Sequence, residues 1–283
     1  MLGSPIAHSL SPVLHRAAYA ALGLTDWAYD RAEVDAPGFA DHLAQLADPA
    51  WRGLSLTAPL KEVALQAAAE VSTVARATGA VNTLVRRADG GWDGHNTDVD
   101  GVAHALREAG VAGVEHAVVV GSGATARSAV AALAQMGASD VHLMVRHRPR
   151  PETMAQARAA GVGAEVLPMG SWPHRLDVVI STVPREATDS LLPTLPVAGP
   201  PGSGVVTFLD AVYGQGPGAL GASAPALGYA VVPGTEMLLH QGAEQVRLMT
   251  GLEPPVPAMR AALEHALQDR AASPAGTSER DEP

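Results

Sequence analysis

The sequence predicts an α/β protein built from an open α/β domain and a Rossmann domain. Stretches with strand character alternate with helical stretches along nearly the whole chain, which is typical of mostly parallel sheets. Residues Gly121 to Ala126 form a G-x-G-x-x-A pattern between a strand and a helix, which is the dinucleotide-binding fingerprint. The length of 283 residues, 47% of them hydrophobic, allows one large or two medium domains with buried cores.

The composition of the chain limits the kinds of molecule that it is expected to bind. The chain carries 29 acidic and 19 basic residues, a formal net charge of −10, which disfavours nucleic acid or an anionic membrane as a partner. It contains no cysteine, which excludes disulfides and thiol chemistry and fits the cytoplasm. No apolar run approaches 18 residues, and the first residues lack a secretion signal pattern. We expect a cytoplasmic protein that acts on a small molecule.

The first hundred residues alternate between short strands and helices. We expect strands at 27–34, 51–56 and 82–85 and a further strand running into 91–98. We expect helices at 13–22, 37–46, 62–70 and 99–109. A mostly parallel sheet binds its ligands at the carboxyl ends of its strands, so polar residues at this edge are site candidates.

Two serines precede the first helix. Ser9 and Ser11 stand one residue apart, between Pro5 and Pro12. Two hydroxyl groups at that spacing can both face one small anion, such as a carboxylate. Alternatively, Ser11 simply caps the helix that follows. The residues alone leave both interpretations open.

Lys61 is the only lysine in the chain, whereas the other 18 basic residues are arginine. Lysine has a compact ammonium group whose pKa can shift toward neutrality, which arginine cannot imitate. Thr57 and Pro59 are typical of the N-cap and first-turn proline of a helix. This places Lys61 in the first turn, where the helix dipole opposes a positive charge. We interpret Lys61 as a chemical group rather than a solvated surface lysine.

Three further polar residues are expected near Lys61. Thr57, Asn82 and Asp98 all lie at ends of predicted strands. Each has an ordinary explanation, since Asp98 could cap a helix and Asn82 could serve in a turn. Four polar residues at one sheet edge are better explained by a site.

The second domain begins with a strand at 116–120, the glycine-rich turn, and a helix at 127–137. Gly121 permits the tight turn, Gly123 allows close approach of the pyrophosphate, and Ala126 allows close packing of helix on strand. The helix N-terminus offers unpaired amides to the phosphates. The predicted cofactor-binding residues of this turn are Gly121, Ser122, Gly123, Ala124, Thr125 and Ala126.

The end of the next strand, 141–145, indicates which dinucleotide binds. A carboxylate at this point would bind the ribose 2′-hydroxyl of NAD, but the chain continues as Arg146, His147 and Arg148, with Arg150 close by. Arginine side chains can hold a 2′-phosphate through charge-assisted hydrogen bonds. The sequence therefore predicts NADP as the cofactor.

The rest of the chain completes the predicted Rossmann domain and then continues as two helices. We expect a helix at 151–161 and strands at 164–167, 177–182, 205–213 and 229–232. Thr182 is expected beside the nicotinamide ribose. Gly234 opens a helix that carries Gln241, and a last helix spans 257–268. Residues 269–283 are polar and rich in serine, proline and charge, which predicts a disordered tail.

Several motifs, in this order and spacing, make the chain resemble the shikimate dehydrogenase family. They are Gly-Ser-Pro-Ile-Ala-His-Ser-Leu-Ser-Pro at 3–12, Leu-Thr-Ala-Pro-Leu-Lys at 56–61, Gly-Ala-Val-Asn-Thr at 79–83, Asn-Thr-Asp at 96–98, Asp-x-x-Tyr at 210–213 and Met-Leu-x-x-Gln at 237–241. The resemblance covers the chain from Met1 to about Leu267.

The resemblance implies a substrate domain at 1–98 with 237–268, a Rossmann NADP-binding domain at 99–236, and an active site in the cleft between them. It implies reversible hydride transfer between NADPH and 3-dehydroshikimate in aromatic amino acid biosynthesis, by a monomer or homodimer with no metal. Lys61 and Asp98 would be the catalytic pair. The implied substrate-binding residues are Ser9, Ser11, Thr57, Asn82, Asp98, Tyr213 and Gln241. The implied cofactor-binding residues are those of the glycine-rich turn with Arg146, His147, Arg148, Thr182 and Gly234.

Two alternatives stay open. A quinate or aminoshikimate dehydrogenase would use the same chemistry on a ring with different substituents, and one sequence does not reveal the pocket that chooses. A ligand-sensing homologue would keep the fold without catalysis. Retention of Lys61, Asp98 and the glycine-rich turn argues against that second alternative.

Overall fold

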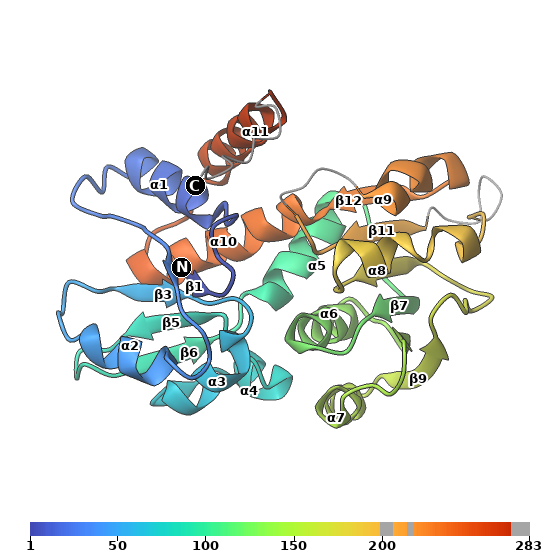
Figure 1. Ribbon diagram of the computed structural model, residues 1–283, viewed down its shortest axis with the longest axis horizontal. Helices are drawn as coiled ribbons and strands as arrows, with labels where there is room; N and C mark the ends of the chain where they lie inside the picture. Colours follow the sequence, from blue (N-terminus) through green and yellow to red (C-terminus); the bar gives the residue numbers. More distant parts are fainter. Residues whose placement is uncertain (199–205, 214–217, 273–283) are drawn as a thin grey trace, which may run out of the picture.

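The computed structural model describes residues 1–198, 206–213 and 218–272. Figure 1 shows two lobes, with helices α5 (Asp98–Glu108) and α10 (Gly234–Thr250) lying between them. We call the lobe that contains β1 to β6 the N-terminal domain and the lobe that contains β7 to β12 the Rossmann domain.

The N-terminal domain contains short strands and helices. Its strands are β1 (Leu2–Gly3), β2 (Ala32–Glu33), β3 (Gly53–Ser55), β4 (Glu70–Val71), β5 (Thr83–Arg86) and β6 (Trp92–His95). Its helices are α1 (Ser11–Ala21), α2 (Phe39–Gln45), α3 (Leu60–Ala67) and α4 (Thr73–Thr78). Strands β1 and β2 pair in parallel, and a bridge from Leu2 to Leu56 links them to the sheet β3-β5-β6-β4.

The expected mostly parallel sheet is confirmed for this domain with one exception: β5 runs antiparallel to both β3 and β6, whereas the other strands share one direction. The start of β5 therefore lies beside the ends of its two neighbours. The backbone of Asn82 pairs with Leu56 after β3 and with His95 at the end of β6. Antiparallel pairing, rather than a shared strand direction, brings Asn82 to the edge where Lys61 and Asp98 lie.

Three local predictions are wrong. Of segment 27–34, only Ala32–Glu33 pairs as a strand, since the rings of Trp27 and Tyr29 pack instead against α1 through Tyr19 and His15. The helix expected to reach residue 70 ends at Ala67. Thr57 does not cap α3; Pro59 occupies the N-cap position, and no side chain caps the helix.

The Rossmann domain is one parallel sheet in the order β12-β11-β10-β7-β8-β9. The strands are β7 (His116–Val120), β8 (Asp140–Val145), β9 (Gly163–Pro168), β10 (Val178–Ser181), β11 (Thr207–Asp210) and β12 (Ala230–Pro233). The helices are α6 (Ala124–Gln135), α7 (Pro151–Ala159), α8 (Arg185–Asp189) and α9 (Ala219–Ser223), with 3₁₀ turns at Leu192–Thr194 and Ala224–Leu227. The chain order reverses between β7 and β10, which is where such sheets bind dinucleotides.

The core of this sheet explains why its strands were predictable. Ala117 and Val119 of β7 pack into a cluster with α5 and α6, whereas Val118 and Val120 pack into a second cluster on the opposite face. A strand buried on both faces appears in the sequence as a continuous apolar run.

Helices α5 and α10 cross closely between the lobes. A Cβ atom at Gly101 of α5 would lie 2.8 Å from the backbone oxygen of Met237, so only glycine fits this crossing. Helix α11 (Val256–Ala272) then packs with α10 on α1. It extends four residues into the predicted tail, whose remainder at 273–283 lies outside the described residues. Within the described ranges, no helix is long and apolar enough to cross a membrane.

Candidate active site

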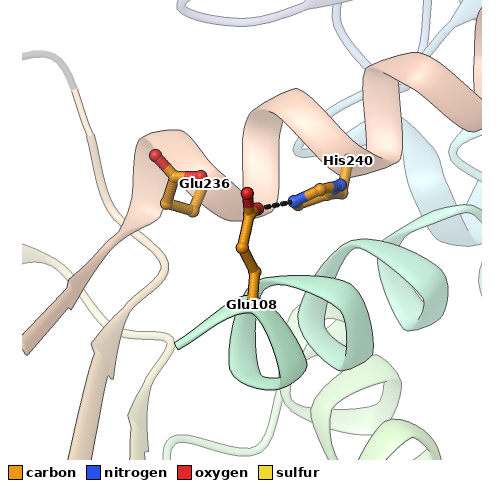
Figure 2. Close-up of side chains that lie close together, drawn as sticks. All are labelled: Glu108, Glu236 and His240. Atoms are coloured by element: carbon orange, nitrogen blue, oxygen red, sulfur yellow. Dashed lines mark hydrogen bonds and ion pairs between the residues drawn. The ribbon is translucent and has the colours of Figure 1, made fainter. Parts of the chain in front are cut away.

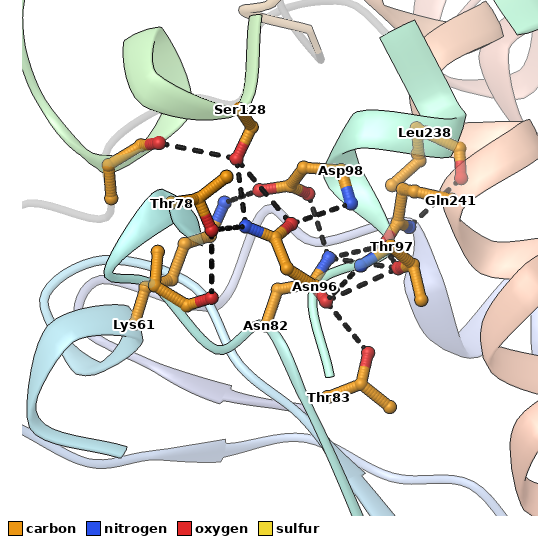
Figure 3. A network of polar contacts seen from close by, with 12 residues as sticks. Lys61, Thr78, Asn82, Thr83, Asn96, Thr97, Asp98, Ser128, Leu238 and Gln241 are labelled. Atoms are coloured by element: carbon orange, nitrogen blue, oxygen red, sulfur yellow. Dashed lines mark hydrogen bonds and ion pairs between the residues drawn. The ribbon is translucent and has the colours of Figure 1, made fainter. Parts of the chain in front are cut away.

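Lys61 and Asp98 form a nearly buried ion pair. Lys61 is the second residue of α3 and Asp98 the first residue of α5. Nζ of Lys61 donates to Oδ2 of Asp98 at 2.5 Å, and the side chains are 13% and 5% exposed (Figure 3). A charge-assisted bond so well shielded from water holds the ammonium group in one place.

Asn82 orients the carboxylate from the other side. Its Nδ2 donates to Oδ1 of Asp98 at 2.8 Å and to Oγ1 of Thr97 at 2.9 Å. Its Oδ1 accepts from the backbone N–H of Thr97 at 2.8 Å. Because a backbone N–H can only donate, it fixes which end of the Asn82 amide faces Asp98. Each carboxylate oxygen of Asp98 therefore has its own donor (Figure 3).

The pair faces a small polar cavity of about 120 Å³. Its lining brings Lys61 together with most of the predicted substrate-binding residues: Ser11, Thr57, Asp98, Tyr213 and Gln241. The hydroxyl of Ser11 is buried and makes no hydrogen bond of normal geometry among the described residues, although the Tyr29 hydroxyl lies near it. An unpaired buried hydroxyl is costly unless a ligand satisfies it, which suits a carboxylate-binding role.

Ser9 and Asn82 do not line the cavity but contact residues that do. The backbone N–H of Ser11 donates to Oγ of Ser9 at 3.3 Å. Burial raises the pKa of the Tyr213 phenol, which a hydrogen bond with Ser9 partly opposes. Asn82 reaches the cavity through Asp98. All seven predicted substrate-binding residues thus belong to one connected region.

Sequence reasoning missed a second buried network behind this cavity. Gln245 donates from Nε2 to Oγ1 of Thr83 at 2.9 Å and accepts from Ser55 at 2.8 Å. Ser55 accepts from the Tyr29 hydroxyl at 2.6 Å, and His15 stacks on the Tyr29 ring. Burial lowers the pKa of His15 to about 3, so the imidazole is neutral. The sequence does contain an indication of this network. Gln245 follows Gln241 by four residues, so the two side chains lie on the same face of one helix.

The glycine-rich turn fits a dinucleotide pyrophosphate. Gly121 adopts φ +112° after β7, and a Cβ atom there would lie 2.5 Å from Oγ1 of Thr182. Gly123 precedes α6, and nothing lies within 4 Å of the place where its Cβ would be. The first amides of a helix lack intrahelical acceptors, so they are available to an anion in this open space.

The other predicted cofactor residues are placed differently. Thr182 donates to the backbone oxygen of Val120, beside the turn. Gly234 is buried against the backbone of Asp210 and lines the cavity. Arg146, His147 and Arg148 are exposed after β8. The structure therefore places Thr182 beside the turn and Gly234 at the cavity, and leaves the basic segment exposed after β8.

One group of described residues has the composition of a metal site. Carboxylate and imidazole atoms of Glu108, Glu236 and His240 lie within 4.8 Å of one another (Figure 2). However, Arg260 donates to Glu236 at 2.6 Å and to Glu108 at 2.8 Å, and His240 bonds Glu108 at 2.6 Å. Because each carboxylate already has a cationic or donor partner, we interpret the group as an ion-pair cluster joining α5, α10 and α11.

Comparison with known proteins places these features in a family. Residues 1–84 match the family model described as shikimate dehydrogenase substrate binding domain, and residues 234–264 match the shikimate 5′-dehydrogenase C-terminal domain. The chain is 38% identical to a shikimate dehydrogenase (NADP(+)) of Halobacterium salinarum over 270 residues, 93% of this chain and 97% of that protein.

Solved structures give the same result. The fold is similar to the shikimate dehydrogenase of Mycobacterium tuberculosis, with a TM-score of 0.84 and 39% identity over 93% of this chain and 97% of that one. It is also similar to the shikimate 5-dehydrogenase of Thermus thermophilus in complex with NADP(H) and shikimate, with a TM-score of 0.77 and 31% identity over 94% and 97% of the two chains. The chain belongs to the shikimate dehydrogenase family.

Proposed function

We propose that this protein is an NADP-dependent shikimate dehydrogenase, which interconverts 3-dehydroshikimate and shikimate in aromatic amino acid biosynthesis. The observation that carries the proposal is the shielded Lys61–Asp98 pair at a small polar cavity, whose lining also includes Thr125 of the cofactor turn. The names of the relatives support the same reaction.

NADPH, when bound, supplies the hydride. Lys61 donates a proton to the oxygen of the reduced ketone and accepts it in the oxidation direction. Asp98 holds the ammonium group toward the cavity and, through Asn82, is itself held in place. The chain's own contribution is therefore a proton donor fixed at one position.

The substrate is bound by the polar lining. Ser9, Ser11 and Tyr213 bind the carboxylate, and the orphaned hydroxyl of Ser11 supports this role. Thr57, Asn82, Asp98 and Gln241 bind ring hydroxyls or the reacting oxygen. The cofactor is bound by the glycine-rich turn with Thr182 and Gly234, and its 2′-phosphate by the segment Arg146 to Arg148.

We further propose that residues 1–98 with 237–268 form the substrate domain and 99–236 the NADP-binding domain. Helix α10 begins at Gly234 and packs on α1, β5 and α11, which supports assigning most of it to the substrate domain, while its crossing with α5 joins the two domains. The protein acts in the cytoplasm as a monomer or homodimer.

An assay of the purified protein tests the proposal. NADP⁺ or NAD⁺ is combined with shikimate or with quinate, and reduced nicotinamide is followed by absorbance. We expect rapid reduction of NADP⁺ with shikimate and slow reduction in the other three combinations. A preference for quinate or for NAD⁺ would reassign the substrate or cofactor, and no reduction in any combination would contradict catalysis.

A further inference from the structure

Glu62, the neighbour of Lys61 in the first turn of α3, is held by two arginines of the Rossmann domain. Oε1 of Glu62 accepts from Nη2 of Arg127 at 2.7 Å and from Nη1 of Arg150 at 3.1 Å. Arg127 lies in the first turn of α6, and Arg150 directly precedes α7. The helix that carries the proton donor is therefore tied to the other domain at its own first turn.

The Arg127 side chain is a rigid connection. It is only 3% exposed, and its Nε donates to the backbone oxygen of Thr78 at 2.5 Å while Nη2 also donates to the backbone oxygen of Gly79 at 3.2 Å. A planar guanidinium with several acceptors in fixed directions has little freedom to move. Removing its only carboxylate partner among the described residues would leave a buried charge without a counterion.

Both arginines also connect to the glycine-rich turn. Arg127 directly follows Ala126, the last residue of the fingerprint. The backbone N–H of Arg150 donates to Oγ of Ser122 at 3.2 Å. A path of direct contacts thus leads from the phosphate-binding turn to Glu62 and from there, along one peptide bond, to Lys61.

We propose that Glu62 and Arg127 are positioning residues for catalysis, which hold the first turn of α3 against the first turn of α6 and so set Lys61 relative to the bound cofactor. This inference rests on the proposed function. The hydrogen bond from Arg127 is the main reason that the pKa of Glu62 lies below its usual range, so the carboxylate is charged at neutral pH. Neither residue lines the substrate cavity, so losing the pair should slow the reaction rather than weaken substrate binding.

Substitution of Glu62 tests the proposal most cleanly, because this residue is half exposed and belongs to the domain opposite the cofactor turn. We compare Glu62→Gln, Glu62→Ala, Arg127→Met and the double variant Glu62→Ala/Arg127→Met. Asp30→Asn is the matched control, since it breaks the exposed Arg16–Asp30 pair of the same domain. The measurements are kcat, KM for shikimate and NADP⁺, and the deuterium isotope effect with shikimate labelled at the carbon that loses hydride.

We expect Glu62→Gln to lower kcat at least tenfold, with both KM values within twofold and a larger isotope effect. The double variant should be no slower than the slower single variant, because coupled residues are not additive. Asp30→Asn should match the wild type. Retention of more than half of kcat in Glu62→Gln, or a rise in KM with unchanged kcat, would overturn the proposal. Independent, additive losses would also overturn it.

Backbone hydrogen exchange provides a readout that needs no turnover and does not depend on the folding of Arg127→Met. Without ligand, amides of residues 60–67 should exchange faster in Glu62→Gln than in the wild type, while those of α1 stay unchanged. Equal exchange at 60–67 would overturn the positioning role. A wild-type protein that does not oxidise shikimate would contradict the proposed function instead, and the exchange result would still decide this inference.

Discussion

Nζ of Lys61 lies 2.5 Å from Oδ2 of Asp98, although each residue occupies the first turn of a different helix. The two helix dipoles act on these charges in opposite senses. The N-terminus of α5 stabilises the carboxylate of Asp98, whereas the N-terminus of α3 opposes the ammonium of Lys61. The ion pair with Asp98 therefore compensates for the unfavourable interaction between the Lys61 ammonium and the dipole of α3.

Replacing Lys61 by alanine should lower kcat by about 10²–10⁴ with little change in shikimate affinity, because a positioned proton donor contributes about that factor. Lys61→Arg should not restore the rate, since a guanidinium keeps its proton and has a different shape. Single-turnover hydride transfer and equilibrium binding measure the two effects. More than about a tenth of the wild-type rate in Lys61→Ala would refute general acid–base catalysis by this lysine.

Asp98→Asn should lower both the rate and the affinity for shikimate. An amide in place of the carboxylate has only one acceptor oxygen, so either Lys61 or Asn82 would face an N–H group instead of its present acceptor. Asp100→Asn on the same helix is the control and should behave as the wild type. Steady-state kinetics of both variants suffice, and equal kcat in the two would contradict the pairing role.

Ser11→Ala and Ser9→Ala should each lower kcat/KM for shikimate tenfold to a hundredfold, mainly through KM. A hydrogen bond to a charged group contributes about 1.5–3 kcal/mol, which corresponds to this range. Ser4→Ala is the control, because Ser4 belongs to the same N-terminal segment as the two serines but its hydroxyl donates to the exposed carboxylate of Glu33. Unchanged kinetics in both test variants would show that the serines only shape the start of α1.

The double variant Arg146→Ala/Arg148→Ala should bind NADP⁺ at least tenfold more weakly and NAD⁺ nearly as before. The reason is the loss of charge-assisted bonds to the 2′-phosphate, which NAD⁺ lacks. Arg158→Ala, an exposed arginine of α7, controls for general loss of positive charge. Calorimetric titration with each cofactor measures the two affinities. An equal loss of affinity for NADP⁺ and NAD⁺ would contradict the assignment of these arginines to the 2′-phosphate.

His15 should make the protein less stable in acid. Burial lowers its pKa to about 3 in the folded state from 6.5. Between these values the unfolded chain binds the extra proton, so the free energy of unfolding falls as the pH drops below about 6.5. His15→Phe should remove about 1.4 kcal/mol per pH unit from this slope between pH 6 and 4. The free energy of unfolding is measured with urea at several pH values. If it depends on pH in the same way in both proteins, His15 does not titrate in this way.

The Rossmann domain could be predicted from sequence far better than the N-terminal domain. Strands such as β7 are buried on both faces, so their apolar runs are unambiguous. The strands of the N-terminal domain have two to four residues, too few for a periodic pattern. Segment 27–34 was expected to be a strand, but the ring of Tyr29 stacks on His15 instead. Tertiary contacts therefore overrode local preference.

The candidate site was predicted as a set of residues but not as a geometry. Lys61 stood out because it is unique, and Asp98 and Asn82 because they lie at strand ends. Their mutual contacts depend on the antiparallel direction of β5, which no local sequence pattern predicts. Gln245 and Arg127 escaped notice because their partners lie far away in the chain, and only the folded structure brings such pairs together.

The contact between His15 and Gln245 joins residues 230 positions apart, and the core around Leu14 is completed by Leu238 and Leu239 of α10. A ribosome that adds about 5–20 residues per second needs about 10–50 seconds to make the intervening chain. During that interval α1 has been made without its partner, whereas each strand of the Rossmann sheet from β7 to β11 follows the one before it closely in sequence. The core around α1 therefore stays incomplete until nearly the whole chain has been made, and the apolar face of α1 is exposed during that time.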